Sequence, residues 1–304
     1  VLGALLTTLG RLRDAGALST LLEALQEKDI ELRRAAALAL GDIGDPAAVP
    51  PLAAALSGDA DLQVRGFAAI SLGRIAGEEA VAALRSAFSA KGASRVARSY
   101  GALGLGLAWD QGSAPDLRRA LDAPGEEAVR GAYAIALGLL GDQEAAGTLF
   151  RVLENRGLDP DLRGYAAIAI GMIRPDEGLP RLLRVVREEA DAVEDCRRGL
   201  LLGLGLFGEA LGTPLILQAL SEERRDVVRG SAAIALNFLR DPAAARILSD
   251  LLSRGSPIPD RSIYACAALG SLGDAHTYPL LSEAFFNANY RVSLPLLGEI
   301  SDLL

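Results

Sequence analysis

The sequence predicts an all-α fold, a right-handed α-solenoid of roughly nine to ten stacked helical hairpins. Three observations predict it. One pattern recurs along nearly the whole chain, each recurrence contains two amphipathic helical segments, and no stretch sustains the period-2 alternation of a strand. A single hairpin of this size cannot bury its apolar side alone, whereas stacking on similar neighbours buries it, so the recurrence itself predicts the solenoid.

The recurrence is followed most easily at one position, which we call the repeat glycine. Residues 32–45 (LRRAAALALGDIGD), 129–142 (VRGAYAIALGLLGD) and 228–241 (VRGSAAIALNFLRD) share one pattern around it. The position is occupied by Gly10, Gly41, Gly73, Gly106, Gly138, Gly171, Gly205, Asn237 and Gly270. Neighbouring members are 31, 32, 33, 32, 33, 34, 32 and 33 residues apart, so the period holds along the chain.

Each unit contains a first helix, a polar loop and a second helix. Residues 46–56 (PAAVPPLAAAL) and 177–186 (EGLPRLLRVV) have the apolar spacing of amphipathic first helices. The second helix is expected to end at a glycine turn such as Gly44-Asp45-Pro46. Acids at or just before the second helix can accept bonds from its free N–H groups. These acids are Asp61, Asp161, Asp195 and Asp226.

Residues 1–304 are expected to form one continuous repeat domain. Roughly nine hairpins and a partial tenth around residues 290–304 account for the period. Residues 1–6 (VLGALL) and 294–297 (LPLL) are as apolar as the middle of the chain, whereas terminal repeats of solenoids have a polar outer face. We therefore expect the chain to be a fragment of a longer protein.

Composition and charge exclude several kinds of partner. The net charge is −8 and the pI about 4.9, so the basic footprint needed for nucleic acid or an anionic membrane is lacking. No run of about 18 apolar residues indicates a membrane span, so no direct membrane insertion is expected. Cys196 and Cys266 lie in apolar helical stretches about two repeats apart, too far to bridge. As buried free thiols they favour a reducing compartment such as the cytoplasm.

The repeat resembles the HEAT family, and in particular the short bacterial HEAT-like repeats first associated with phycobilisome lyases. The motif [VL]-R-x-x-A-A-x-A-L-G-x-[IL]-G-D-P is most complete at residues 32–46 and is echoed in every unit. The resemblance implies an armadillo-type superhelix with first helices on the convex side and second helices lining the concave side. It also implies a proline that bends the first helix, at Pro50, Pro115, Pro180, Pro214 and Pro279.

An arginine recurs in the first turn of the second helix, eight residues before the repeat glycine in most units. This arginine row consists of Arg33, Arg65, Arg98, Arg130, Arg163, Arg197 and Arg229. It could bind acidic or phosphorylated partners along one edge of the groove, with Arg130, Arg163 and Arg197 as candidates. The interpretation we favour is a structural ladder with loop acids such as Asp61, Asp161 and Asp195. For Arg163 we expect Asp159 and Asp161 as partners.

Pairs of glycines seven residues apart occur within the second helices. They are Gly66 and Gly73, Gly131 and Gly138, and Gly164 and Gly171. Glycine costs about 1 kcal/mol in a helix interior relative to alanine, so a compensating role is expected. Close approach of helices is the interpretation we favour. The alternative is a smooth concave groove that receives a partner segment.

Aromatic residues give a second set of candidates. Phe67, Tyr100, Tyr133, Tyr165 and Tyr264 fall near one place in the second helix, where packing between repeats is the favoured role. Trp109 differs, because it replaces a turn glycine and is therefore expected in an exposed loop. A lone exposed tryptophan is a candidate partner contact.

The sequence offers little for catalysis. His276 is the only histidine and lies far from any acid or cysteine cluster, so we expect no metal site, no cofactor and no enzymatic activity. The paired His-Glu motifs of HEAT-like deoxyhypusine hydroxylases have no match here. The basic, aromatic-rich face of HEAT-like alkylpurine DNA glycosylases is also lacking.

The sequence therefore favours a non-enzymatic protein–protein interaction scaffold that binds a partner segment along the concave face. The alternative is a subunit that resembles the HEAT-like phycobilin lyases and handles a bilin and its carrier protein. Such a subunit would need cationic groups facing the chromophore, and only the arginine row offers them.

Overall fold

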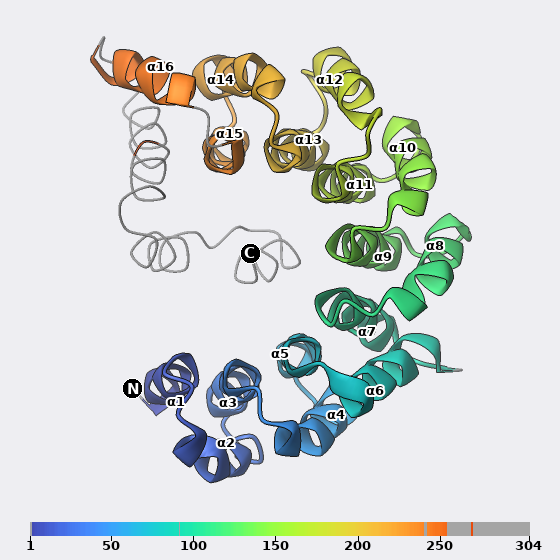
Figure 1. Cartoon of the computed structure of the whole chain (residues 1–304), viewed down its shortest axis with the longest axis vertical. Coiled ribbons are helices and arrows are strands. Elements are labelled where there is room, and N and C mark those ends of the chain that lie inside the picture. Colours follow the sequence, from blue (N-terminus) through green and yellow to red (C-terminus); the bar gives the residue numbers. More distant parts are fainter. Residues whose placement is uncertain (1, 91, 240–241, 254–268, 270–304) are drawn as a thin grey trace. The chain divides into compact units, whose positions relative to one another are not determined.

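The computed structural model describes residues 2–90, 92–239, 242–253 and 269 (Figure 1). The described residues form α-helices and short 3-10 helices, without a strand among them. They divide into two compact units, Val1–Val152 and Leu153–Leu304, with the division inside helix α10 (Ala146–Glu154). The all-α prediction is confirmed for these residues. The expectation of one continuous domain over residues 1–304 stays a prediction.

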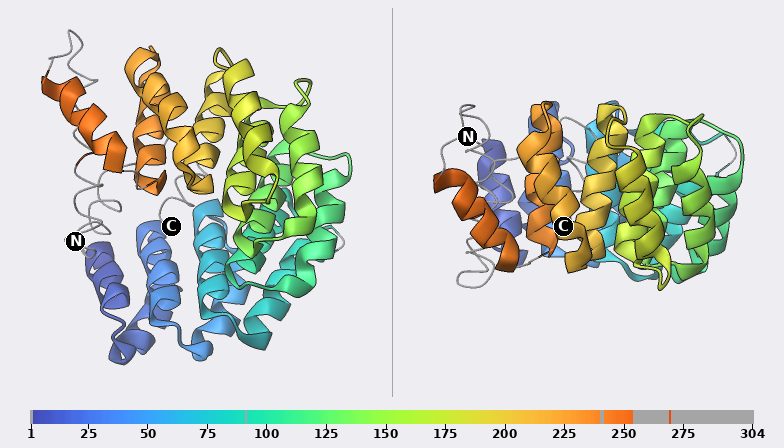
Figure 2. Two further views of the ribbon diagram at one scale, coloured as in Figure 1. Left: turned by 45° about the horizontal axis from the view of Figure 1, so that its top comes forward. Right: turned by 90° about the horizontal axis from the view of Figure 1, so that it is seen from above.

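Unit 1 contains two layers of helices (Figures 1 and 2). The layer of second helices consists of α1 (Leu2–Arg11), α3 (Ile30–Ile43), α5 (Leu62–Ile75), α7 (Arg95–Leu107) and α9 (Glu127–Leu140), and each packs against the next. The layer of first helices consists of α2 (Leu18–Ala24), α4 (Val49–Gly58), α6 (Gly77–Ser89) and α8 (Ala114–Asp122). Each first helix contacts the second helix that follows it, which is the hairpin expected from the repeat.

Unit 2 repeats this arrangement. Its second helices are α11 (Pro160–Ile173), α13 (Glu194–Phe207) and α15 (Asp226–Leu239), packed in that order. Its first helices are α12 (Gly178–Glu188), α14 (Thr213–Glu222) and α16 (Pro242–Ser253). Within the units, the described residues thus contain six complete hairpins: α2 with α3, α4 with α5, α6 with α7 and α8 with α9 in unit 1, and α12 with α13 and α14 with α15 in unit 2. The expected hairpins beyond α15 extend onto residues outside the described ranges.

The core of each unit lies between its two layers. In unit 1 the leucines of first helices, such as Leu52 and Leu84, are fully buried against those of second helices, such as Leu40 and Leu72. Alanines at neighbouring positions are equally buried, because they allow the helices to pack closely. The many small apolar residues in the sequence are therefore explained by helix contacts within and between hairpins.

The turn after each second helix has the left-handed backbone that the glycine pattern predicts. The residue three after the repeat glycine has positive φ in every described repeat from Arg13 to Gly208. These residues are Arg13 (φ 52), Gly44 (φ 77), Ala76 (φ 54), Trp109 (φ 54), Gly141 (φ 65), Arg174 (φ 51) and Gly208 (φ 79). The conformation is therefore a property of the repeat, and four units adopt it without glycine.

The resemblance implied that the recurrent proline bends a continuous first helix, but the proline lies instead near the start of an α-helix. In three hairpins a short 3-10 helix, such as η2 (Pro46–Ala48) or η3 (Gln111–Ser113), precedes the α-helix, and the proline lies at N1 or N2 of that α-helix. Pro50, Pro115 and Pro214 are placed in this way, and Pro180 is the third residue of α12. The first turn of a helix tolerates proline because its N–H groups have no partner there. Pro279 lies outside the described residues.

Candidate functional site

The arginine row lies on the side of the second helices that faces the first helices. Six of its members donate to main-chain carbonyls at or just after the end of a first helix. The pairs are Arg33 with Glu27 and Lys28, Arg65 with Asp59, Arg130 with Leu121, Arg163 with Leu153, Arg197 with Val186, and Arg229 with Glu223. The last carbonyls of a helix lack partners within it, so the row closes each hairpin. Arg98 is the exposed member.

Carboxylates join the row at three of its members. Arg33 donates to both carboxylate oxygens of Asp59 at 2.9 and 3.1 Å, Arg163 pairs with Glu189, and Arg229 pairs with Asp226. Arg163 and Arg229 are 6% and 2% exposed and so cannot reach a partner protein. The structural interpretation of the row is confirmed for these residues. Its main acceptors, however, are carbonyls, which the sequence analysis did not predict.

The acceptor expected for Arg163 was wrong. Asp159 is the N-cap of α11, where its side chain accepts bonds from the N–H groups of Asp161 and Leu162. The carboxylate that Arg163 contacts is Glu189, which is 8% exposed and follows α12 in the next hairpin. The side chain of Arg163 thus points towards the next repeat, whereas the loop acids before it serve the helix end.

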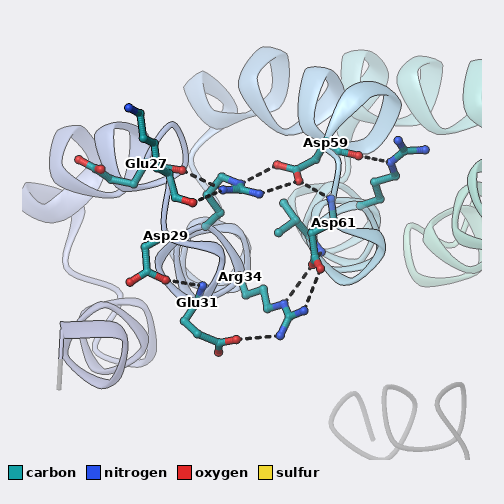
Figure 3. Close-up of polar contacts among 10 residues, drawn as sticks. Glu27, Asp29, Glu31, Arg34, Asp59 and Asp61 are labelled. Atoms are coloured by element: carbon teal, nitrogen blue, oxygen red, sulfur yellow. Dashed lines mark hydrogen bonds and ion pairs between the residues drawn. The ribbon is translucent and has the colours of Figure 1, made fainter.

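The acids assigned to the ladder lie at the predicted helix starts but contact other residues. Asp61 caps α5 and pairs at 2.8 Å with Arg34, which directly follows the row member Arg33 in the sequence (Figure 3). The hydrogen bond from Arg34 lowers the pKa of Asp61. Asp195 lies 3.5 Å from Arg198, and burial raises the pKa of Asp161. The Asp61–Arg34 pair thus ties α3 to the loop of the following repeat, whereas Asp195 pairs within its own helix.

The glycine pairs of α5 and α11 are buried against neighbouring second helices, as the favoured close-approach interpretation predicted, so the alternative of a smooth groove does not hold for them. A Cβ at Gly66 would lie 2.7 Å from the Tyr100 ring, and one at Gly73 would lie 2.7 Å from the Gly104 carbonyl oxygen. Gly164 and Gly171 face α13 in the same way, and Gly131 and Gly138 are also buried. The close-approach interpretation is confirmed where these contacts are described.

The aromatic residues also pack between repeats, as expected. Phe67 and Tyr100 pack against the core of unit 1, and Tyr133 makes an edge-to-face contact with Phe88, with ring centroids 5.5 Å apart. Tyr165 is buried, and burial raises its pKa. Tyr264 lies outside the described residues, as do Cys266 and His276.

Cys196 is buried, as predicted. Burial raises the pKa of its thiol to about 11, which keeps it protonated near neutral pH. Among the described residues no group of three or more His, Cys, Asp or Glu side chains is arranged to hold a metal ion. None of the described helices is long and apolar enough to cross a membrane.

Trp109 is exposed, as predicted from its place in a turn. Its relative exposure is 70%, the second highest among the large apolar side chains of the described residues, after Leu12 at 71%. Its φ of 54° lies in the left-handed region, where a side chain costs about 1 kcal/mol or more relative to glycine. The fold therefore gains nothing evident from tryptophan at this position.

The sequence analysis missed two rows of apolar residues on the second helices. At 100° per residue, positions three before and one after the repeat glycine point away from the first helices, between the contacts to the preceding and following second helices. One residue after the repeat glycine the side chains are apolar and partly exposed in the later repeats, Leu107 and Leu139 in unit 1 and Met172, Leu206 and Phe238 in unit 2, whereas the first three repeats have Arg11, Asp42 and Arg74 there. Three residues before it stand Leu38, Ile70, Leu103, Ile135, Ile168, Leu202 and Ile234. Their periodicity with the repeat was the signal that could have found them.

Arginines outside the arginine row, on the first helices, connect one hairpin to the next. Arg85 donates to Asp110 at 2.6 and 2.8 Å, and Arg118 contacts Asp142 and Glu144. Arg181 and Glu154 repeat the arrangement in unit 2 with two bonds of 2.5 and 2.6 Å. These pairs therefore neutralise three arginines within the fold.

The ion pair of Glu223 and Arg225 gives a prediction for acid stability. The hydrogen bond from Arg225 lowers the pKa of Glu223 to about 2, from 4.5. Because the folded state holds the proton less tightly, this pair stabilises the fold fully above pH 4.5, and the contribution is lost as pH falls towards 2. We expect Glu223→Gln to remove on the order of 2–3 kcal/mol at neutral pH and to flatten the loss of stability in this range.

Urea unfolding at a series of pH values, followed by circular dichroism, measures the effect. Glu222→Gln, an exposed neighbour on α14, is the matched control and should unfold like the wild type. A Glu223→Gln variant with the wild-type dependence on pH would show that the pair contributes nothing.

Comparison with known proteins agrees with the geometry. A family model described as HEAT repeats matches residues 1–65, 24–104, 114–195 and 153–236. No curated protein sequence matches the chain significantly. Among solved structures, a chain of the complex of CpcE and CpcF of phycocyanin lyase from Nostoc sp. PCC7120 is 24% identical, with a TM-score of 0.52, and the match covers 84% of this chain and 94% of that chain.

Two further structures are similar at lower scores. Human deoxyhypusine hydroxylase is 17% identical, with a TM-score of 0.41 and coverage of 84% of this chain and 95% of that chain. The YibA protein of Escherichia coli is 20% identical, with a TM-score of 0.46 and coverage of 88% and 96%. The family-model matches extend over most of the sequence and coincide with the hairpins described above. The chain is a member of the HEAT repeat family.

Proposed function

We propose that this chain is a non-enzymatic protein–protein interaction scaffold that binds a partner segment along the concave face, formed by the open side of the second helices. The observation that carries the proposal is the apolar row one residue after the repeat glycine. In unit 1 Leu107 and Leu139 stay partly exposed there, and in unit 2 Met172 and Leu206 do the same. Partly exposed apolar residues in register are suited to the buried centre of a protein interface.

The fate of the other candidates supports this choice of surface. The buried arginines donate to carbonyls and carboxylates within the fold, and the glycine pairs of α5 and α11 are covered by neighbouring helices. Neither set can reach a partner without unfolding the hairpins. The apolar row is not covered in this way. It lies on the side of each second helix between its contacts with the preceding and the following second helix.

The test is a comparison of capture from native lysate with matched variants. Leu107→Ser combined with Leu139→Ser should reduce the amount of captured partner at least threefold, measured by quantitative mass spectrometry. Serine keeps the Cβ atoms that pack over Gly73 and Gly106, so the fold should persist, and circular dichroism checks it. Leu211→Ser, at a residue 67% exposed in the 3-10 helix η5 (Ala210–Gly212) of unit 2, is the control. Equal capture by all three proteins would overturn the proposal.

The same proteins test the alternative of a bilin-handling subunit. That alternative draws on the likeness to the phycocyanin lyase complex, which at 24% identity concerns the fold. Co-expression with a bilin should leave the purified chain without visible absorbance if the scaffold proposal is right. Stoichiometric visible absorbance that persists through purification would favour the lyase-like function instead.

A further inference from the structure

Trp109 is the only tryptophan in the chain, and its side chain is not used by the fold. It occupies a turn position where the other described repeats have glycine, alanine or arginine, and it is 70% exposed there. The equivalent residues in the two adjacent repeats, Ala76 and Gly141, are small. The indole therefore projects into solvent from the turn between α7 and η3, and the turns after α5 and α9 occupy the same place in the adjacent repeats.

Acidic side chains flank the indole in both neighbouring repeats. Two and three residues after the turn position stand Glu78 and Glu79 in the preceding repeat, and Glu144 lies at the third position in the following one. All three are exposed. The repeat of Trp109 itself has neutral Gln111 and Gly112 at these positions. The tryptophan thus lies between two acidic sites, about one repeat away on either side.

The cations close to these residues are already paired. Arg74 contacts Asp42 at 2.6 Å, Arg85 contacts Asp110 at 2.6 Å, and Arg118 contacts both Asp142 and Glu144. Glu78 and Glu79 lie in the first turn of α6 and have no ion pair with a described residue. The surface around the indole is therefore negative.

We propose that this edge of unit 1, formed by Trp109 with Glu78 and Glu79, binds an extended basic segment of a partner protein. The inference rests on the proposed scaffold function and adds the chemistry of a second contact surface. A guanidinium or ammonium group is attracted to the face of an indole, and the carboxylates of Glu78 and Glu79 would hold a further cation, whereas Glu144 already pairs with Arg118. Acidic or purely apolar segments lack this complementarity.

The spacing of the repeats sets the spacing of the cations. Packed helices lie about 8–10 Å apart, so the acidic sites are about that far from the indole along the edge. An extended chain advances about 3.3 Å per residue. A segment with a basic residue at about every third position therefore matches first the two carboxylates of Glu78 and Glu79 and then the indole of Trp109.

The probe is a nine-residue peptide with the sequence Arg-Gly-Ser repeated three times. Because Trp109 is the only tryptophan, its intrinsic fluorescence reports directly on this surface. We expect saturable quenching on titration, which weakens as salt is added because the carboxylate contacts are screened. A peptide of the same composition with its three arginines adjacent should bind at least threefold more weakly, and one with glutamate in place of arginine should not bind.

Variants are measured with a fluorescently labelled form of the same peptide. Trp109→Gly should weaken binding at least tenfold and should not lower the melting temperature, since glycine suits the left-handed turn. Glu78→Gln with Glu79→Gln should weaken binding at least threefold. The matched control, Glu23→Gln with Glu27→Gln, removes the same charge from exposed positions of the α2 hairpin and should change affinity less than twofold.

Several results would overturn the inference. They are an unchanged affinity in Trp109→Gly, equal weakening by the two glutamine pairs, or preference for the glutamate peptide. Dimerisation of the free chain that Trp109→Gly abolishes would show a second copy to be the occupant. Failure here is distinguishable from failure of the scaffold proposal, because that proposal is tested by Leu107→Ser with Leu139→Ser and a native partner.

Discussion

Replacing Gly171 with alanine is expected to lower the free energy of unfolding by about 2–3 kcal/mol. An added Cβ would lie 2.1 Å from the carbonyl oxygen of Gly203 and 2.9 Å from its Cα. Both atoms belong to the backbone of α13, so no side chain can move aside, and α11 and α13 must separate. Separation exposes the apolar contacts along both helices, which outweighs the gain of about 1 kcal/mol that alanine brings to a helix.

The contact is reciprocal, which makes the expectation sharper. A Cβ at Gly203 would lie 2.2 Å from the Ala167 carbonyl oxygen, and one at Gly199 would lie 2.3 Å from the Cα of Gly164. Gly203→Ala should therefore destabilise the protein to a similar extent. The two variants together should cost less than the sum of the single effects, because helices that have separated for one methyl group accommodate the other.

Urea unfolding followed by far-ultraviolet circular dichroism measures these changes. The control is Gly147→Ala, since Gly147 is an exposed helical glycine of α10 with no atom within 4 Å of its Cβ position. It should gain up to about 1 kcal/mol from helix propensity. Wild-type stability in Gly171→Ala would mean that α11 and α13 are not in backbone contact.

Replacing Arg163 with glutamine is expected to cost about 3 kcal/mol or more, because it leaves the buried Glu189 carboxylate with little compensation. Arg163 and Glu189 are 6% and 8% exposed, and the guanidinium also donates to the Leu153 carbonyl at 2.9 Å. Arg156 contacts Glu189 at 3.1 Å from a more exposed position, so it offsets part of the loss. A carboxylate buried this deeply loses much of its hydration when the protein folds, so it needs a cation nearby.

Two further variants separate the ion pair from simple loss of packing. Arg163→Met combined with Glu189→Leu removes both charges and should recover part of the stability, since apolar replacements of buried pairs are often tolerated. Arg151→Gln breaks an exposed pair with Asp122 and should cost less than about 1 kcal/mol. If Arg163→Gln unfolds at the urea concentration of Arg151→Gln, the buried pair is not a stabilising contact.

Much of this protein follows from the sequence, because its repeat constrains both helices and turns. The spacing of Gly41, Gly73 and Gly106 predicted the hairpin and its period, since a periodic apolar pattern specifies which side of a helix is buried. The exposure of Trp109 also followed from the sequence. Its position in the repeat corresponds to a turn glycine, and a turn side chain is exposed wherever it occurs.

The contacts of individual side chains were decided by the tertiary structure. Arg163 was assigned to the acids nearest in sequence, yet Asp159 is used by the helix end, and Glu189 reaches Arg163 from the next hairpin. For Gly164 and Gly171 the sequence left a close helix contact and an open groove as alternatives, and the packing of α13 decided for the contact. A repeat pattern gives the angle of a residue around its helix. Whether another helix or solvent occupies that direction depends on how closely and in which direction neighbouring hairpins pack, which long-range contacts determine.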